Sequence, residues 1–155
     1  MNRSIDSARD TDVLAALRTA TASRHERLDS GLPLSAPTPS LDDYAAHLRM
    51  VRDWLAPLES WLAGFADGPY ADPALPPLGR VALIQAELAE PGMPDVPPMR
   101  PAACWPPDAS AAYRWGVAYV IEGSQLGGAV LYKNLAARLA PHPLRYLRGE
   151  EGGPG

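Results

Sequence analysis

Residues 119–128 read Tyr-Val-Ile-Glu-Gly-Ser-Gln-Leu-Gly-Gly and lie inside a long segment with helical spacing of apolar residues. We predict a single helix there from about Ala109 to Leu139, ended by Pro141. Gly123, Gly127 and Gly128 each cost a helix about 1 kcal/mol relative to alanine. A helix that carries this cost usually needs bare backbone where another group comes close.

Gly123 and Gly127 are four residues apart and therefore share one face of the predicted helix. That face could meet another helix, or it could lie against a flat ligand. Ser124 stands beside it and could place a hydroxyl group near such a ligand. The motif alone leaves both interpretations open, and helix packing is the more ordinary of the two.

A second candidate residue, His25, lies on the first strong helix of the sequence, which we predict from about Asp12 to Asp29. His25 follows Leu17 and Thr21 on one apolar face, so we expect its imidazole to point inward. An inward imidazole needs a hydrogen-bond partner on each nitrogen, or a metal on one of them.

The residues near His25 are compatible with both a metal-bound and a hydrogen-bonded imidazole. Arg18 lies two turns earlier on nearly the same face. Asp29 lies one turn later and could hold the second ring nitrogen, as carboxylates do for metal-bound histidines. The alternative is a core histidine satisfied by hydrogen bonds, which is the commoner situation for a lone histidine on an apolar face.

The rest of the chain also reads as helices and loops. Ser40 and Asp43 resemble a capping box before a second helix, which Pro57 should kink. The predicted apolar stripe of this helix consists of Leu41, Tyr44, Ala45, Leu48, Val51, Leu55, Leu58 and Leu62. A shorter helix is expected near Gly79 to Ala89, and residues 91–107 are rich in proline and should form a surface loop. No alternating strand pattern is present, so we predict an all-α protein with a single domain spanning residues 1–155.

Composition narrows the classes of function. The net charge of −4 argues against broad nucleic-acid binding. The single cysteine, Cys104, and the polar first residues without a signal peptide point to the cytoplasm. Residues 115–132 are long enough to span a membrane, but Glu122, Ser124 and Gln125 at their centre make a span unfavourable, so we expect no membrane association.

The two candidate features complement one another. One helix offers a single inward metal-ligand histidine, and another offers a bare backbone that can bend. An iron macrocycle bound on one face and closely covered on the other has these requirements. A close glycine helix would leave room for a small ligand such as dioxygen and little else.

Three segments carry a resemblance to a known family. Residues 17–25 (LRTATASRH) are similar to the proximal-helix signature of heme oxygenases, which ends in the heme-ligating histidine. Residues 48–59 resemble the second helix of the bacterial members. Residues 119–128 closely resemble the distal-helix signature, especially in the branch found beside bacterial phytochromes. The resemblance implies an all-α helical bundle that holds heme between a proximal and a kinked distal helix.

The resemblance also implies roles for individual residues. His25 would be the iron ligand, and Arg18 and Tyr119 would contact heme propionates. Gly123 and Gly127, with Gly128 beside them, would let the distal backbone approach the heme. Ser124 stands where many animal members have a carboxylate that orders water, and some bacterial members resemble this chain in having serine.

The sequence departs from the family after the distal helix. The family continues with further helices that add basic contacts to the propionates, whereas residues 141–155 resemble only the loop that precedes them. We therefore expect a heme oxygenase-like bundle that lacks the C-terminal helices.

The activity implied by the resemblance is oxidative cleavage of heme to biliverdin, carbon monoxide and iron. Heme would be both substrate and cofactor, O₂ the oxidant, and an external donor (a ferredoxin, a reductase or a small reductant) would supply electrons. A bacteriophytochrome is an expected recipient of the biliverdin. The first alternative is a protein of this fold that binds heme or another tetrapyrrole without degrading it. A second alternative is a helical enzyme with a cysteine nucleophile, but Cys104 lies in a proline-rich loop.

Overall fold

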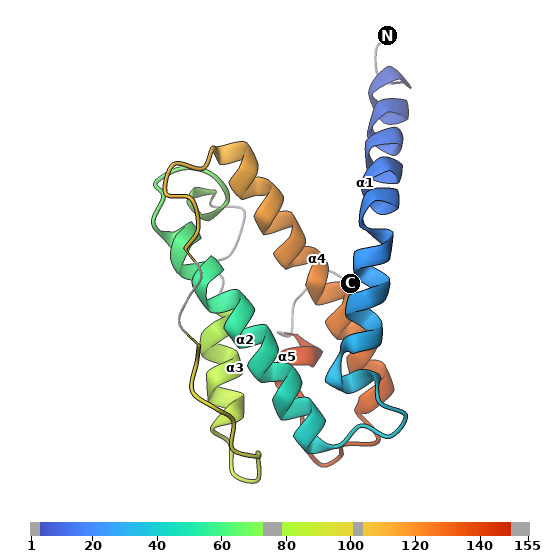
Figure 1. The fold of residues 1–155 in the computed structure, drawn as a ribbon, viewed down its shortest axis with the longest axis vertical. Coiled ribbons are helices and arrows are strands. Elements are labelled where there is room, and N and C mark those ends of the chain that lie inside the picture. Colours follow the sequence, from blue (N-terminus) through green and yellow to red (C-terminus); the bar gives the residue numbers. More distant parts are fainter. Residues whose placement is uncertain (1–3, 73–78, 101–103, 150–155) are drawn as a thin grey trace.

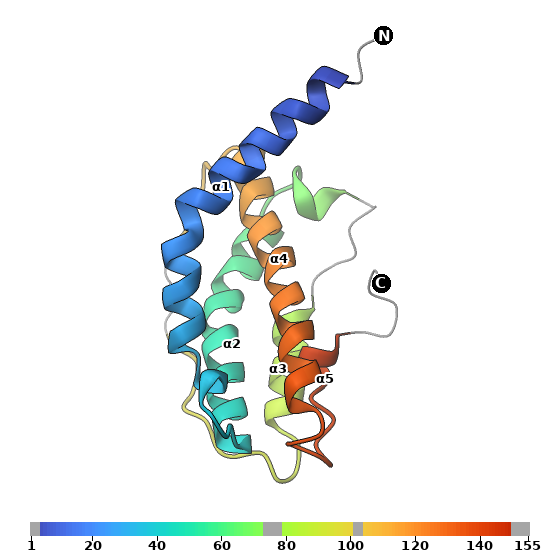
Figure 2. The same cartoon turned by 90° about the vertical axis from the view of Figure 1, so that its right-hand side faces the viewer.

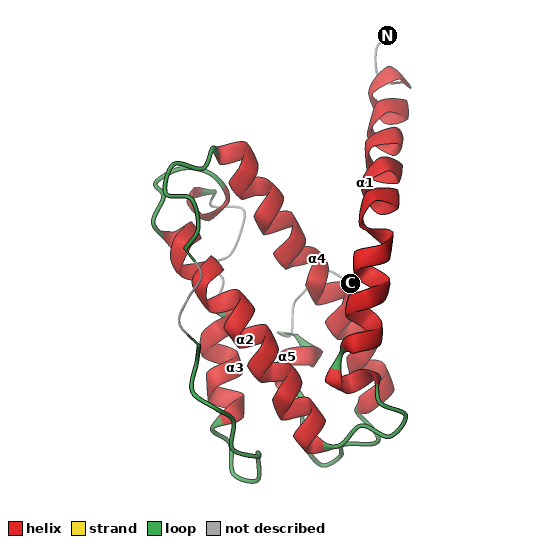
Figure 3. Cartoon of the chain, in the orientation of Figure 1, coloured by secondary structure: helices red, strands yellow, loops and turns green. Residues whose placement is uncertain are grey.

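A computed structural model describes residues 4–72, 79–100 and 104–149, with side-chain surroundings from residue 12 onward. The described residues contain helices and no strand, which confirms the predicted all-α class (Figure 3). The elements in chain order, with η for a short 3₁₀ helix, are α1 (Ser4–Gly31), η1 (Pro33–Ser35), α2 (Leu41–Ala63), η2 (Pro69–Ala71), α3 (Arg80–Leu88), α4 (Ala111–Leu135) and α5 (Arg145–Arg148).

The central helix of the fold is α2, and the sequence explains where it begins. The Ser40 backbone N–H donates to Asp43 Oδ2 at 2.8 Å, and the Asp43 N–H donates to Ser40 Oγ at 3.3 Å. This reciprocal pair is the capping box expected from the sequence. The pKa of Asp43 is lowered, chiefly by the hydrogen bond from the Ser40 backbone. The helix continues through Pro57 to Ala63.

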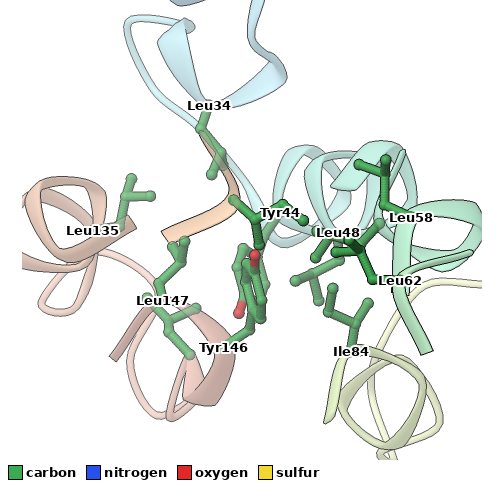
Figure 4. Packing of buried hydrophobic residues seen from close by; sticks show 12 residues of the cluster. Leu34, Tyr44, Leu48, Leu58, Leu62, Ile84, Leu135, Tyr146 and Leu147 are labelled. Carbon is green, nitrogen blue, oxygen red and sulfur yellow. The ribbon is translucent and has the colours of Figure 1, made fainter. Parts of the chain in front are cut away.

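The hydrophobic core combines side chains of α2, α3, α4 and the α5 segment (Figures 1 and 4). Among these helices, α2 packs on α3, and α5 packs on both α3 and α4. The predicted stripe of α2 supplies its largest share. The core residues buried to 1% exposure or less on α2 are Tyr44, Ala45, Leu48, Leu55, Leu58 and Leu62. Ile84 of α3 and Ile121 of α4 pack into the same cluster.

The last long helix is shorter than predicted, and the chain then returns to the core. Instead of continuing to Leu139, α4 ends at Leu135, and turns occupy the next residues. The short helix α5 follows, and its neighbourhood contributes the buried Leu144, Tyr146 and Leu147. The sequence did not predict α5, because a helix of four residues is too short to show a period.

The first helix differs most from expectation. It begins at Ser4, earlier than Asp12, and its N-terminal half extends beyond the bundle (Figure 1). Within residues 12–31 every residue is exposed except Thr21. The prediction that the face with His25 points into the core is therefore wrong for the described residues. The helix packs mainly on η1, and no described element covers its apolar side.

No helix among the described residues is long and apolar enough to cross a bilayer.

Candidate functional site

The glycine face of α4 is open. Both Gly123 and Gly127 are exposed, and a Cβ added at either would meet no heavy atom within 4 Å. The same holds at Gly116, two turns before Gly123. Packing against another described helix therefore does not account for the glycines at 123 and 127.

Gly128 differs from these two positions. It is half-buried, and a Cβ placed there would lie 3.7 Å from Leu147 Cδ2. Its nearest described neighbour is thus the α5 segment, on the inner side of α4. The sequence grouped Gly128 with the ligand-facing glycines, and the structure instead places it toward the core.

Large apolar and aromatic side chains surround the open glycines. Tyr119 is 66% exposed, Val120 59% and Leu126 76%. Val130 is exposed as well and, seven residues after Gly123, lies on the same side of the helix. An exposed apolar patch of this kind marks an interaction site more often than a bare surface. The sequence reasoning selected Tyr119 but missed the aliphatic residues, although their spacing from the glycines would have identified them.

The inner side of the same segment is held by polar contacts from α3 and α5. The Arg80 guanidinium donates to both Glu122 carboxylate oxygens, at 3.0 and 2.9 Å. Gln125 Nε2 donates to Tyr146 Oη at 3.3 Å and to Ser124 Oγ at 3.1 Å. Ser124 in turn donates to the Ile121 carbonyl at 2.6 Å. The segment is therefore held by side chains of α3 and α5, whereas its glycine face has no described neighbour.

On α1, the proposed iron ligand is accessible and unengaged. His25 and Arg18 are exposed, and neither side chain forms a hydrogen bond or ion pair with a described residue. The expected contact from Asp29 to the imidazole of His25 is not formed among these residues. An imidazole without a partner keeps both nitrogens available to a ligand or to water.

The two helices that carry these features lie on the same side of the bundle. The C-terminal half of α1 overlaps α4 in Figure 1, and Figure 2, turned by 90°, shows the two helices separated, with α2 visible between them. The structure thus brings the C-terminal half of α1 and helix α4 to one side of the bundle without extensive packing between them. The two helices have different supports, since α1 contacts η1, whereas α4 contacts α5 and η2.

A pocket of about 370 Å³ lies between the end of α1 and α2. Its volume is at the small end of the range for small-molecule sites. The lining residues are Arg24, Arg27, Leu28, Gly31, Leu32 and Met50. None of the residues predicted from the sequence lines it, so it adjoins the candidate site and does not contain it.

Two buried residues of α2 carry polar groups, and the sequence reasoning missed one of them, His47. His47 is 6% exposed with its Nδ1 unpartnered, and burial lowers its pKa to about 4. The Tyr44 hydroxyl is buried beside Glu87, and its pKa is raised by burial first and by the charge of Glu87 second. Both residues lie in the core and away from the open faces.

The described residues include no group of three or more His, Cys, Asp or Glu side chains placed to hold a metal ion. A heme requires fewer protein ligands, because the macrocycle supplies four nitrogen ligands and the protein can supply one. Exposed His25 offers one such ligand, and the open α4 face around Gly123 and Gly127 is flanked by exposed apolar side chains. The residues present therefore fit a heme.

The comparisons with known proteins give one local similarity. The chain is 52% identical over 48 residues to a protein named heme oxygenase from Xanthomonas campestris pv. campestris (strain 8004). The matched segment covers 30% of this chain and only 29% of that relative. No family model matches the chain, and no solved structure matches it. The similarity supports a relationship to heme oxygenases over that segment.

Proposed function

We propose that this protein is a heme oxygenase that opens heme to biliverdin with O₂ and electrons from an external donor. The observation that carries the proposal is the open face of α4, where Gly123 and Gly127 approach no described residue. Glycines that weaken a helix without serving its packing are explained by a ligand that needs bare backbone. The local similarity to a protein named heme oxygenase supports the same ligand.

Each residue of the site has a role in this proposal. His25 supplies the imidazole that ligates the iron, and Arg18 and Tyr119 pair with the propionates. Gly123 and Gly127 let the distal backbone come close, while their apolar neighbours exclude water. Ser124 holds an ordered water at the edge of this face. Bound heme supplies the iron and oxygen chemistry of ring opening and is itself the substrate.

The finer features of the proposal concern partners. A ferredoxin, a reductase or a small reductant delivers the electrons, and a bacteriophytochrome of the same cell receives the biliverdin. The protein acts in the cytoplasm.

The test is a hemin titration followed by ascorbate in air. We expect a one-to-one heme complex whose visible spectrum converts to that of a bilin. In His25→Ala the spectrum and the iron coordination should differ from those of the parent, while apoprotein stability stays unchanged because His25 is exposed. A heme complex that persists under ascorbate and air would favour a tetrapyrrole-binding protein. An unchanged spectrum in His25→Ala would remove this residue from the ligand role.

A further inference from the structure

A chain of hydrogen bonds leads from the buried core to the edge of the open α4 face. It begins at the hydroxyl of Tyr146, whose residue is 7% exposed. Gln125 Nε2 lies 3.3 Å from this oxygen and 3.1 Å from Ser124 Oγ. Ser124 Oγ lies 2.6 Å from the carbonyl oxygen of Ile121. Three side chains from α4 and α5 thus form a continuous path to an exposed serine.

The direction of each bond follows from the last acceptor. A carbonyl oxygen can only accept, so the Ser124 proton is committed to Ile121. The Gln125 atom that faces Ser124 must then donate, which identifies it as the amide nitrogen. The second proton of that nitrogen goes to Tyr146, so the hydroxyl of Tyr146 accepts.

The backbone of Tyr146, at the buried end of this hydrogen-bond chain, is held in place by Glu87. Its backbone N–H donates to Glu87 Oε2 at 2.8 Å, and the N–H of Arg145 donates to Glu87 Oε1 at 2.7 Å. Glu87 is only 1% exposed, so this carboxylate ties α5 to α3 inside the core. Burial raises the pKa of Tyr146, and the hydrogen bond from Gln125 opposes part of that rise.

We propose that Tyr146 is a positioning residue that acts through Gln125 on Ser124. With its proton committed inward and one lone pair occupied by Gln125, Ser124 Oγ meets a ligand or water on the open face only as a hydrogen-bond acceptor. The group opposite Ser124 must therefore be a donor, such as a water O–H. This inference rests on the proposed function for its effect on heme, whereas the hydrogen-bond chain itself belongs to the apoprotein.

The first arm of the test uses the apoprotein. The sequence has two glutamines, Gln85 and Gln125, so their side-chain amides give two assignable pairs of ¹⁵N-correlated NMR signals. Gln85 is exposed and serves as the internal reference. We expect the Gln125 protons to differ in shift and to exchange with water more slowly than those of Gln85. In Tyr146→Phe the Gln125 pair should move toward the Gln85 pair.

Tyr70→Phe is the matched control, because it also removes a buried tyrosine hydroxyl, and that hydroxyl has no hydrogen-bond partner among the described residues. It should leave the Gln125 signals in place. If Tyr146→Phe leaves them in place as well, or if Tyr70→Phe moves them equally, the positioning role is overturned.

The second arm uses the hemin-loaded protein. Loss of one ordinary hydrogen bond in Tyr146→Phe should lower kcat for ascorbate-driven heme conversion about three- to tenfold. The hemin dissociation constant should stay within about twofold of the parent, because the ligand face itself is unaltered; a merely structural role would weaken both. Gln125→Glu is nearly isosteric but cannot donate to Ser124 while the serine proton is committed, so it should lose at least as much kcat.

The outcomes separate the two proposals. Normal kcat in Gln125→Glu would show that the chain does not run in the stated direction and would overturn the acceptor role of Ser124. Failure of every variant and of the parent to bind hemin would overturn the proposed function. The NMR arm would then still decide whether Tyr146 fixes Gln125.

Discussion

At Gly127, ligand approach and helix packing predict opposite changes in apoprotein stability when alanine replaces glycine. Gly127→Ala removes a helix penalty of about 1 kcal/mol, and the added methyl meets no described atom within 4 Å. We expect the apoprotein to gain up to about 1 kcal/mol in free energy of unfolding, while heme turnover falls because the methyl intrudes on the ligand. Thermal melts of the apo forms and the ascorbate assay measure the two effects.

Gly68 provides the contrast for that experiment. Its φ is +85°, and a Cβ there would lie 2.7 Å from the Arg114 guanidinium. Gly68→Ala should therefore destabilise the protein, in contrast to Gly127→Ala. A lowered melting temperature for Gly127→Ala with normal turnover would contradict the ligand role of this glycine.

His47 makes the stability of the fold depend on pH. Its pKa falls from 6.5 to about 4 on burial, so the unfolded chain binds the proton more tightly than the native one. Stability from this residue is complete above about pH 6.5 and is lost as the pH falls toward 4. A difference of this size corresponds to about 3 kcal/mol at most.

Urea unfolding of the parent and of His47→Leu between pH 4 and 7.5 tests this dependence. The variant should lose less stability than the parent on acidification, because leucine does not titrate. Parallel profiles for the two proteins would show that His47 is not the source of the acid sensitivity.

At single positions, the sequence identified the glycine motif of α4 but not the long-range contacts that hold its surroundings in place. The open glycines at 123 and 127 follow from helix propensity and a four-residue spacing. The contacts of Glu87 with the α5 backbone join residues 58 and 59 positions apart, and no local pattern encodes such a pairing. For the same reason the sequence could not show that Gly128 faces Leu147.

Among the helices, α5 depends most on a single side chain. Its N-cap residue Leu144 has φ +48° and makes no side-chain cap, so Glu87 accepts from the first backbone N–H groups instead. Glu87→Ala would leave two N–H groups without an acceptor, one of them buried. We expect a loss of about 3 kcal/mol or more in free energy of unfolding.

Chemical denaturation of Glu87→Ala and Glu87→Gln measures this contribution. Glutamine keeps one acceptor oxygen and should lose less than alanine. Glu90→Ala is a suitable comparison, because Glu90 contacts the half-exposed side chain of Arg145 and does not cap the helix. Equal losses in Glu87→Ala and Glu90→Ala would show that capping of α5 contributes little.

Each helix was predictable to the extent that its own sequence carries a cap or an apolar period. The capping box and the long apolar stripe predicted α2, and both are present. The burial of the α1 face with His25 was predicted from a few apolar residues at helical spacing, and that prediction was wrong for the described residues. Periodicity shows that one face of a helix is apolar, but it does not say whether the chain itself or a ligand covers that face.

The arrangement of the whole molecule gives the last test. The core joins α2, α3, α4 and α5, whereas α1 packs mainly on η1 and leaves residues 12–31 exposed apart from Thr21. Backbone amides of α1 should therefore exchange with deuterium much faster than those of α2 in the apoprotein.

A heme held between His25 on α1 and the glycine face of α4 would join the first helix to the core. Binding to the packed state stabilises that state by mass action, so hemin at 100 times its dissociation constant should contribute about 2.7 kcal/mol. Amide exchange in residues 18–31 should then slow by up to about a hundredfold, with a smaller effect in α2, as hydrogen exchange followed by mass spectrometry would show. In His25→Ala the slowing should be weaker at equal hemin. Slowing in α4 without any change in α1 would mean that heme binds to the glycine face alone, and the two-helix site would then be wrong.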